Sequence, residues 1–174
     1  MEYIFETEHL RVRRFEFEDA RHLFENHLEE EVKKWIPNES YADMEETQEA
    51  IRFYVECVNC RRLPYVLAVE LKETGELIGD TGVNEVEGKT DEVEIGYGIS
   101  KKHSGKGHAT ELLQAMTEFI AATFGIKILY GRVMHGNNAS VRVLEKNDYV
   151  FVREEFGAED DPYGNGMLIY KKEC

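Results

Sequence analysis

Apolar side chains recur at two spacings along the chain, and each spacing predicts a kind of element. Alternation at every second position predicts strands at residues 9–14, 65–71, 77–83, 92–99, 126–134, 149–153 and 167–172. Apolar residues three or four positions apart predict helices at residues 20–28, 44–58, 109–123 and 138–146. The clearest stripe joins Ala109, Leu112, Leu113, Met116, Phe119, Ile120 and Thr123.

The order of these elements predicts a mixed sheet. The three strands of residues 65–99 are separated by turns at Thr74-Gly75 and Gly88-Lys89, which is typical of an antiparallel meander. The long helix that follows returns into residues 126–134, and this crossover makes that strand pair parallel. At 174 residues the chain is close to the length of one domain. We therefore predict one α+β domain over residues 1–174, mostly antiparallel with a central parallel pair.

The net charge of the chain limits the classes of partner that it can bind. The chain holds 21 basic and 35 acidic residues, a net charge of −14. Binding to nucleic acid or to anionic membranes requires positive surface, so neither partner is expected, whereas a cationic partner is compatible. Residues 1–7 lack the apolar segment of a leader, and no apolar run is long enough to span a membrane.

The cysteines favour a reducing setting without a metal. Cys57 and Cys60 form a C-x-x-C, but the second pair that a structural zinc site needs is missing. With Cys174 the count is three, and an odd count is typical of a cytoplasmic protein. We expect packing or surface roles for all three and no metal.

A basic, glycine-containing turn opens the long helix. Gly105 and Gly107 let backbone N–H groups point at an anion, and a helix start adds unpaired donors and the positive end of its dipole. The densest basic cluster of the acidic chain lies in this turn: Lys101, Lys102 and Lys106. The turn is therefore either a phosphate cradle or a solvated turn. The fingerprints of P-loop and dinucleotide-binding proteins are both unmet, so a general nucleotide site fits poorly.

Two other features lie at the same end of the parallel strands, where ligands bind in open sheets. Gly96 and Gly98 interrupt a good strand, which indicates either close approach by a ligand or packing against a bulky neighbour. Asn137 and Asn138 follow the parallel partner strand, and their alternative role is to cap the helix that begins there.

Four segments together resemble the GNAT superfamily of acetyl-CoA-dependent acyltransferases, and more narrowly the RimJ/RimL-type N-acetyltransferases. The segments are residues 6–13 (ETEHLRVR), 94–97 (EIGY), 105–111 (GKGHATE) and 137–146 (NNASVRVLEK). The resemblance covers nearly the whole chain, and the last two segments in combination are specific. It implies the GNAT fold, in which the parallel strands splay apart near residues 97–99 and 130–134 and hold the pantetheine arm between them.

The resemblance also implies which residues bind acetyl-CoA. The family motif Gln/Arg-x-x-Gly-x-Gly/Ala falls on Ser104, Gly105, Lys106, Gly107, His108 and Ala109. Further contacts are implied for Tyr97, Gly98, Ile99, Asn137 and Ser140, and the backbone of Gly98 and Ile99 would polarise the thioester carbonyl. Ser104 replaces the usual Gln or Arg, which we expect to weaken pyrophosphate binding without abolishing it. Asp148 replaces a glycine and is expected to adopt its left-handed conformation.

The implied reaction is direct acetyl transfer to a primary amine. Glu94 is the first candidate for the base, and its alternative role is that of a surface carboxylate on a strand. Many GNAT enzymes protonate the leaving thiolate with a Tyr, where this chain has Leu144. Ser140, one turn earlier, is the candidate acid, unless it only binds the cofactor or caps the helix. Tyr97 is a weaker candidate.

The acceptor side is less specified. The resemblance assigns it to the first two helices, their connection through Trp35 and Tyr41, and the loop of residues 154–166, although we expect Trp35 to be a core residue. The loop acids either attract a cationic acceptor or form a solvated charge run: Glu154, Glu155, Glu159, Asp160 and Asp161. We expect a small-molecule or peptide amine as acceptor and a monomer or homodimer. The alternatives are a catalytically weak acetyl-CoA sensor and, less favoured, a nucleotide-binding protein.

Overall fold

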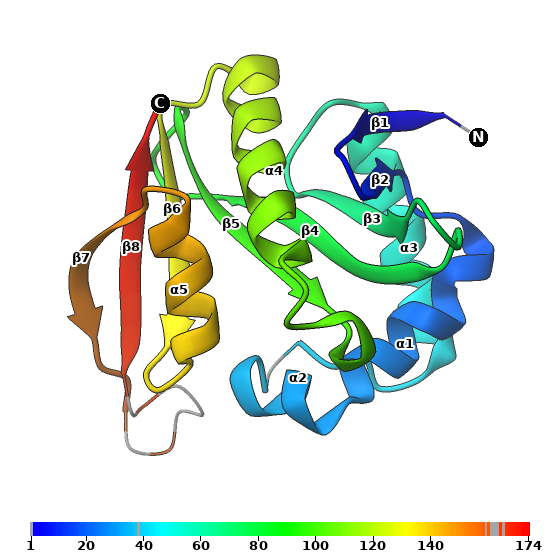
Figure 1. Ribbon diagram of the computed structural model, residues 1–174, viewed down its shortest axis with the longest axis horizontal. Helices are drawn as coiled ribbons and strands as arrows, with labels where there is room; N and C mark the ends of the chain where they lie inside the picture. Colours follow the sequence, from blue (N-terminus) through cyan, green and yellow to red (C-terminus); the bar gives the residue numbers. More distant parts are fainter. Residues whose placement is uncertain (1, 38, 159, 161–163, 165) are drawn as a thin grey trace.

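One sheet runs through the molecule with its strands in the order β1-β2-β3-β4-β5-β6-β8-β7 (Figure 1). The computed structural model describes residues 2–37, 39–158, 160, 164 and 166–174. The strands are β1 (Tyr3–Glu6), β2 (Leu10–Arg13), β3 (Tyr65–Leu71), β4 (Leu77–Glu85), β5 (Glu92–Ile99), β6 (Ile128–Met134), β7 (Val150–Glu155) and β8 (Met167–Glu173). Every neighbouring pair is antiparallel except β5 and β6, which are parallel. The predicted meander and the predicted parallel pair are therefore confirmed.

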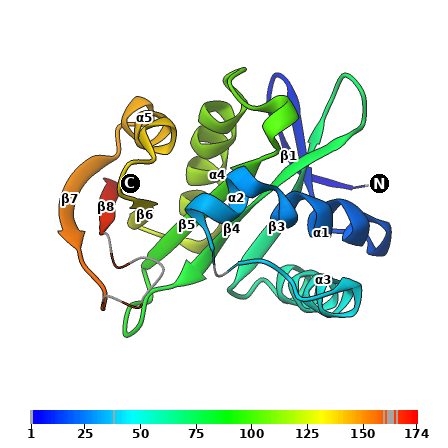
Figure 2. The same ribbon diagram turned by 90° about the horizontal axis from the view of Figure 1, so that it is seen from below.

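Helices cover both faces of the sheet. They are α1 (Ala20–Leu28), α2 (Glu30–Trp35), α3 (Met44–Asn59), α4 (His108–Phe124) and α5 (Asn138–Lys146). Figure 2 shows α4 and α5 on one face, and α1 and α3 on the other. We call these the α4/α5 face and the α1/α3 face.

One helix and one strand are absent from the sequence prediction, and neither has a periodic apolar pattern. The six residues of α2 contain no buried side chain, so no stripe could reveal the helix. Strand β1 is four residues long at the edge of the sheet, too short for a recognisable alternation. The strand predicted at 126–134 begins two residues later, at Ile128.

The larger of two apolar clusters includes the buried face of α4 on the sheet, and a second lies between the sheet and α1 and α3. Leu112, Leu113, Met116 and Ile120 are fully buried in the larger cluster, and each contributes roughly 1.5–3 kcal/mol relative to an exposed side chain. The prediction of Thr123 in this stripe is wrong, since that residue is exposed. Thr117 is buried instead, because its hydroxyl donates to the Leu113 carbonyl and meets the Tyr149 hydroxyl. These hydrogen bonds satisfy a polar group that the apolar pattern could not assign to the core.

Candidate active site

The parallel strands β5 and β6 separate in the middle of the sheet. Their pairing ends where Ile95 meets Gly131, although β5 continues to Ile99 and β6 to Met134. Each strand keeps its outer neighbour: β5 stays paired with β4 as far as Ile99, and β6 with β8 as far as Met134. A gap therefore opens between residues 96–99 and 132–134, as the resemblance implied. In the part of the chain that the structure describes, this edge of β5 has no strand partner beyond Ile95.

The glycines of β5 line open space rather than packed side chains. A Cβ atom built on Gly96 or Gly98 would meet nothing within 4 Å, so packing against a bulky neighbour does not explain them. Gly79 on β4 is different, because a Cβ there would lie 2.0 Å from the Gly98 carbonyl oxygen. The backbone of Gly98 thus lies hard against β4 and is open elsewhere, which suits the approach of a ligand.

The turn at the start of α4 has the conformation of a cradle. Gly105 and Gly107 have φ values of 73° and 86°, which L-residues rarely adopt. Gly107 is the N-cap and supplies no side-chain cap, so the first N–H groups of α4 keep their donors directed outward. The Ser104 hydroxyl donates to the Lys101 carbonyl within the turn.

The lysines of the turn do not act alike. Lys102 forms an ion pair with Glu76, whereas Lys106 takes part in no ion pair among the residues that the structure describes. The backbone N–H of Lys101 donates to the Glu29 carboxylate, which fixes the turn to the corner between α1 and α2. Within the described residues the Lys101 ammonium is likewise in no ion pair, so the side chains of Lys101 and Lys106 both remain available to an anion.

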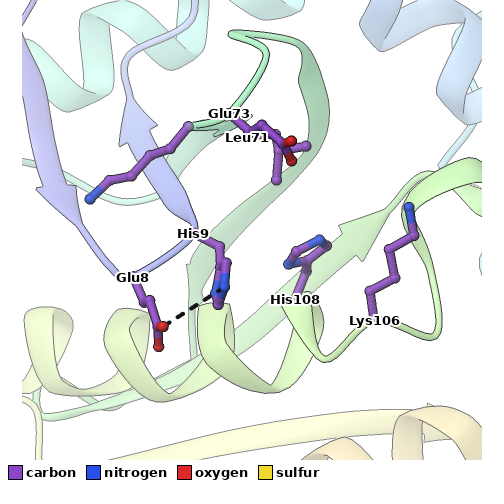
Figure 3. Close-up of a pocket in the computed structure, with 7 residues that line it drawn as sticks. Glu8, His9, Leu71, Glu73, Lys106 and His108 are labelled. Carbon is purple, nitrogen blue, oxygen red and sulfur yellow. Dashed lines mark ion pairs between the residues drawn. The ribbon is translucent and has the colours of Figure 1, made fainter.

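The structure places the His108 side chain away from the gap. It lines a pocket of about 470 Å³ together with Glu8, His9, Leu71, Lys72, Glu73 and Lys106. Figure 3 shows the lining side chains. None of these residues belongs to β5 or β6. The His108 ring is buried, which lowers its pKa, and its Nδ1 has no hydrogen-bond partner among the residues that the structure describes. Its position in the family motif thus points to its backbone, not to its ring.

Two hydroxyl groups meet on the α4/α5 face of the gap. The Tyr97 and Ser140 hydroxyl oxygens lie 3.0 Å apart, although 43 positions separate the residues in the chain. Asn137 caps α5 by accepting from the Ser140 backbone N–H at 3.3 Å, so the expected capping role is observed. Burial raises the pKa of Tyr97 to about 12. Both hydroxyls therefore stay protonated near neutral pH and can donate.

Leu144, at the position where the resemblance places a tyrosine, packs its side chain against Gly131 of β6. It is fully buried, and a Cβ built on Gly131 would lie 2.6 Å from its Cδ2. A larger residue at position 131 would push α5 away from β6. Asp148, just beyond α5, has a φ of 62°, which is the left-handed conformation predicted for it.

Glu94 lies on the other face. Side chains alternate along a strand, so Glu94 projects to the α1/α3 face while Tyr97 projects to the α4/α5 face. Its side chain is 41% exposed and lies 3.9 Å from the Arg132 guanidinium. Partial burial raises the pKa of Glu94, and the charges of Glu39 and Glu155 add to this, although Arg132 opposes it. The structure therefore places Glu94 and Ser140 on opposite faces of the gap rather than side by side.

The expected acceptor residues are only partly where the sequence placed them. Trp35 is half-buried rather than in the core, and its ring lies 3.9 Å from a Cβ built on Gly136, at the end of β6. Glu154 bonds to His135, and Glu155 bonds to Arg132 and Arg153, so both carboxylates have partners within the chain. Of the remaining loop acids, Asp160 is exposed, and Glu159 and Asp161 lie outside the described residues.

Two polar residues of the α1/α3 face were missed from the sequence. His27 and Asp80 lie 3.2 Å apart, from Nε2 to Oδ2, although they are far apart in the chain. The available signal was the position of His27 four residues after Leu23, on the buried side of α1, where the prediction had placed Leu28. Asp80 carried no local signal.

Comparison with known proteins gives this arrangement its family. The family model described as an acetyltransferase (GNAT) domain matches residues 9–150. The chain belongs to the GNAT acetyltransferase family. It is a GNAT-family N-acetyltransferase, and enzymes of this family use acetyl-CoA and act on amine acceptors.

Relatives and solved structures agree with this assignment. The chain is 27% identical to p20 of Bacillus licheniformis, described as an uncharacterized N-acetyltransferase, over 94% of this chain and 89% of that protein. Its fold is similar to that of the ribosomal-protein α-amino acetyltransferase RimL in complex with coenzyme A, with a TM-score of 0.82, 18% identity, and coverage of 99% and 98%. A GNAT-family acetyltransferase of Bacillus anthracis gives a TM-score of 0.79 at 24% identity, with coverage of 97% and 96%.

The described residues contain neither a metal-binding cluster nor a membrane-spanning helix. Within them, no group of three or more His, Cys, Asp or Glu side chains is arranged to hold a metal ion. No helix in the described ranges combines the length and the apolar character needed to cross a bilayer.

Proposed function

We propose that this enzyme transfers the acetyl group of acetyl-CoA directly to a primary amine, either the α-amine of a protein N-terminus or a small-molecule amine. One observation carries the proposal: β5 and β6 diverge beside a glycine cradle, and the gap between them connects two faces that carry different chemistry. The α4/α5 face offers hydroxyl donors, and the α1/α3 face offers a carboxylate whose pKa is raised.

The residues present fit the cofactor. The edge of β5 that is unpaired beyond Ile95 suits a pantetheine arm, and the N–H groups of residues 105–109 suit its pyrophosphate. The motif positions Ser104, Gly105, Lys106, Gly107, His108 and Ala109 would act chiefly through the backbone, with Lys106 adding charge. The backbone of Gly98 and Ile99 would bond the arm and polarise the thioester carbonyl, and Asn137 would contact the pantetheine.

Two proton transfers accompany the reaction. The neutral amine attacks the thioester carbonyl, the C–S bond breaks, and the acetyl group becomes an amide. Glu94 takes the proton from the amine, directly or through water, on the α1/α3 face. Ser140, bonded to Tyr97, gives a proton to the thiolate on the α4/α5 face. The gap lets the two ends of the reaction use different faces of one sheet.

The acceptor class follows from amine chemistry and from the relatives. An α-amine has a pKa of about 8, against about 10.4 for lysine, so it reaches the neutral form with less help. A neighbouring structure is described as an enzyme that modifies the N-terminal serine of a ribosomal protein. These points support a RimJ/RimL-type activity. Three free cysteines support a reducing, cytoplasmic setting for a one-domain enzyme that is a monomer or a homodimer.

Release of coenzyme A in the presence of an amine panel tests the proposal. The panel contains N-terminal peptides, polyamines, aminoglycosides and amino acids, and the acetylated product is confirmed by mass. Turnover on at least one amine is expected. Tight binding of acetyl-CoA without turnover on any of them would favour a sensor, an outcome consistent with Leu144 at the usual tyrosine position and with Ser104 in the cofactor motif.

A further inference from the structure

His27 bonds two acceptors with its two ring nitrogens. Nδ1 lies 2.7 Å from the Glu39 backbone carbonyl oxygen, and Nε2 lies 3.2 Å from the Asp80 carboxylate. Both partners only accept, whereas a neutral imidazole has a single N–H to give. His27 satisfies both partners when it carries two protons, as an imidazolium. The residue is 8% exposed, so this charge is held inside the protein.

The surroundings of His27 favour that charge. Burial by itself lowers the pKa of His27, but the hydrogen bond and charge of Asp80 outweigh it, helped by Glu39, so that the net shift is upward. The remaining neighbour is the Tyr41 ring, 5.2 Å away between centroids, and it is uncharged because burial raises its own pKa. No cation faces the ring among the groups that perturb it.

The bonds of His27 join three parts of the chain at the edge of the gap. The residue belongs to α1, Glu39 to the connection between α2 and α3, and Asp80 to β4. Ser40 adds to this connection by donating its hydroxyl to the His27 carbonyl at 3.1 Å. Asp80 pairs in register with Gly98 of β5, and opposed residues of an antiparallel pair project to the same face. The cluster therefore lies on the α1/α3 face, beside the backbone that borders the gap.

We propose that His27 is a positioning residue of the acceptor site, which as an imidazolium holds residues 39–41 against β4 and fixes the Asp80 carboxylate beside Gly98. The inference rests on the proposed function, because it takes the α1/α3 face as the side from which the amine approaches. His27 touches no reacting atom, since both of its nitrogens are occupied. It acts on the acceptor indirectly, through the positions of residues 39–41 and of the Asp80 carboxylate.

A purely structural role is a poor explanation of this arrangement. A buried ion pair is often no more stabilising than apolar residues of the same volume, so stability alone gives little reason to bury a charged histidine here. Because Asp80 lies beside the gap, the charge of His27 can fix the Asp80 carboxylate at the proposed acceptor site. A variant can therefore lose acceptor binding while the fold and the cofactor site remain intact.

Substitutions that keep one nitrogen at a time separate the two bonds. The amide nitrogen of His27→Asn is placed like Nδ1 and keeps the Glu39 bond, whereas that of His27→Gln is placed like Nε2 and keeps the Asp80 bond. Loss of a charged hydrogen bond predicts an acceptor KM about tenfold higher in His27→Asn, with a smaller rise in His27→Gln. The affinity for acetyl-CoA is expected to stay within about twofold, because no cofactor contact changes. His22→Gln, at an exposed position of the same helix, is the matched control.

Protonation gives a test that does not depend on activity. The ¹⁵N chemical shifts of the His27 ring in the wild-type protein are expected to show both nitrogens protonated at pH 7. Because the pKa is raised, the charge is present at low pH and is lost as pH rises through that pKa, and the acceptor KM rises with it. This inflection is expected to disappear in His27→Gln.

The outcomes distinguish the two proposals. A neutral His27 ring at pH 7, or a folded His27→Asn variant with the wild-type acceptor KM, overturns the positioning role alone. A wild-type protein that acetylates no amine overturns the proposed function, and the acceptor role of His27 with it. Should His27→Asn fail to fold, the ring shifts of the wild type and the KM of His27→Gln still decide.

Discussion

The pairing of Tyr97 with Ser140 yields the most local prediction. Ser140→Ala removes the hydroxyl proposed to protonate the thiolate but leaves the cap of α5, because Asn137 bonds the backbone N–H at position 140. We expect kcat to fall about 10²-fold or more, a typical loss for a proton-transfer group, while the Kd of acetyl-CoA changes little. Steady-state kinetics and calorimetry measure the two quantities.

Tyr97→Phe is the companion variant. It removes the partner of the Ser140 hydroxyl without touching the serine. The two substitutions are expected to be non-additive, because they interrupt one hydrogen-bonded unit. Equal losses of kcat and of cofactor affinity in Ser140→Ala would show that the hydroxyl only binds.

The raised pKa of Glu94 gives a pH dependence with a definite sign. The base acts as a carboxylate, so kcat/KM falls as pH drops through the pKa of Glu94, which lies above the ordinary glutamate value of 4.5. Glu94→Gln is expected to lower kcat/KM and to remove the limb at the pKa of Glu94, leaving only the limb at higher pH that protonation of the amine itself causes. A pH profile of wild type and variant measures it.

Glu92→Gln is the matched control for Glu94. Glu92 lies two residues earlier on the same face of β5 but is occupied by the Tyr130 hydroxyl at 2.8 Å and by Lys89. Its substitution should leave the acidic limb in place. A limb below that of the amine that persists in Glu94→Gln would assign the base to another group.

At the residue scale, candidate residues could be identified from the sequence, but the contacts between them could not. Glu94, Tyr97 and Ser140 were all singled out, yet only the fold shows that Tyr97 and Ser140 bond and that Glu94 lies on the opposite face. His27 and Asp80 were missed because their relation is purely tertiary, between a helix and a strand far apart in the chain.

At the scale of elements, the start of α4 can be compared with its end. Gly107 and Gly125 flank the helix with φ values of 86° and 66°, and a Cβ at either would meet open space. Substitution by Glu imposes the same charge and a similar strain, about 1–2 kcal/mol, at both ends. Gly107→Glu is expected to abolish acetyl-CoA binding, and Gly125→Glu to leave it intact.

Calorimetric titration of both variants with acetyl-CoA measures the difference, and thermal unfolding confirms that both are folded. Equal affinities of the two variants for acetyl-CoA would contradict the proposal that the turn at residues 101–107 binds the cofactor.

Gly79 and Gly98 of the meander differ in the space around them, so their substitution is expected to have different effects. Gly79→Ala places a Cβ against the Gly98 carbonyl, and such overpacking is expected to destabilise the fold by about 1–3 kcal/mol. Gly98→Ala meets no atom and should leave the free energy of unfolding nearly unchanged, but its methyl group projects beside Asp80 onto the α1/α3 face and should raise the acceptor KM. Denaturant unfolding and steady-state kinetics measure the pair. An unchanged acceptor KM in Gly98→Ala would mean that the acceptor does not approach the face beside Gly98.

Elements with a periodic apolar face could be predicted, and the others could not. The meander and the crossover through α4 follow from their spacing, because each buries one face. Strand β1 and helix α2 bury too little to leave a pattern, and the splay of β5 from β6 is a matter of pairing, which spacing does not encode. That feature came from the family resemblance alone.

At the scale of the whole molecule, the net charge of −14 is distributed unevenly over the surface. The basic cluster beside α4 is smaller than the sequence suggests, because Lys102 is engaged by Glu76, and Lys101 and Lys106 remain to meet an anion. The α1/α3 face of the gap holds Glu94 and Asp80. Arg132 faces Glu94 and His27 bonds Asp80, so the negative charge of this face is partly balanced by its own side chains.

The central claim is that the gap lets an amine attack the acetyl thioester directly. All three cysteines lie outside β5 and β6, with Cys57 buried in α3, which leaves no thiol in the gap to carry an acetyl group. The most direct test is the initial velocity of coenzyme A release with acetyl-CoA and the amine both varied. Intersecting double-reciprocal lines are predicted, because both substrates must be bound together. Parallel lines would indicate an acetylated enzyme and contradict the account.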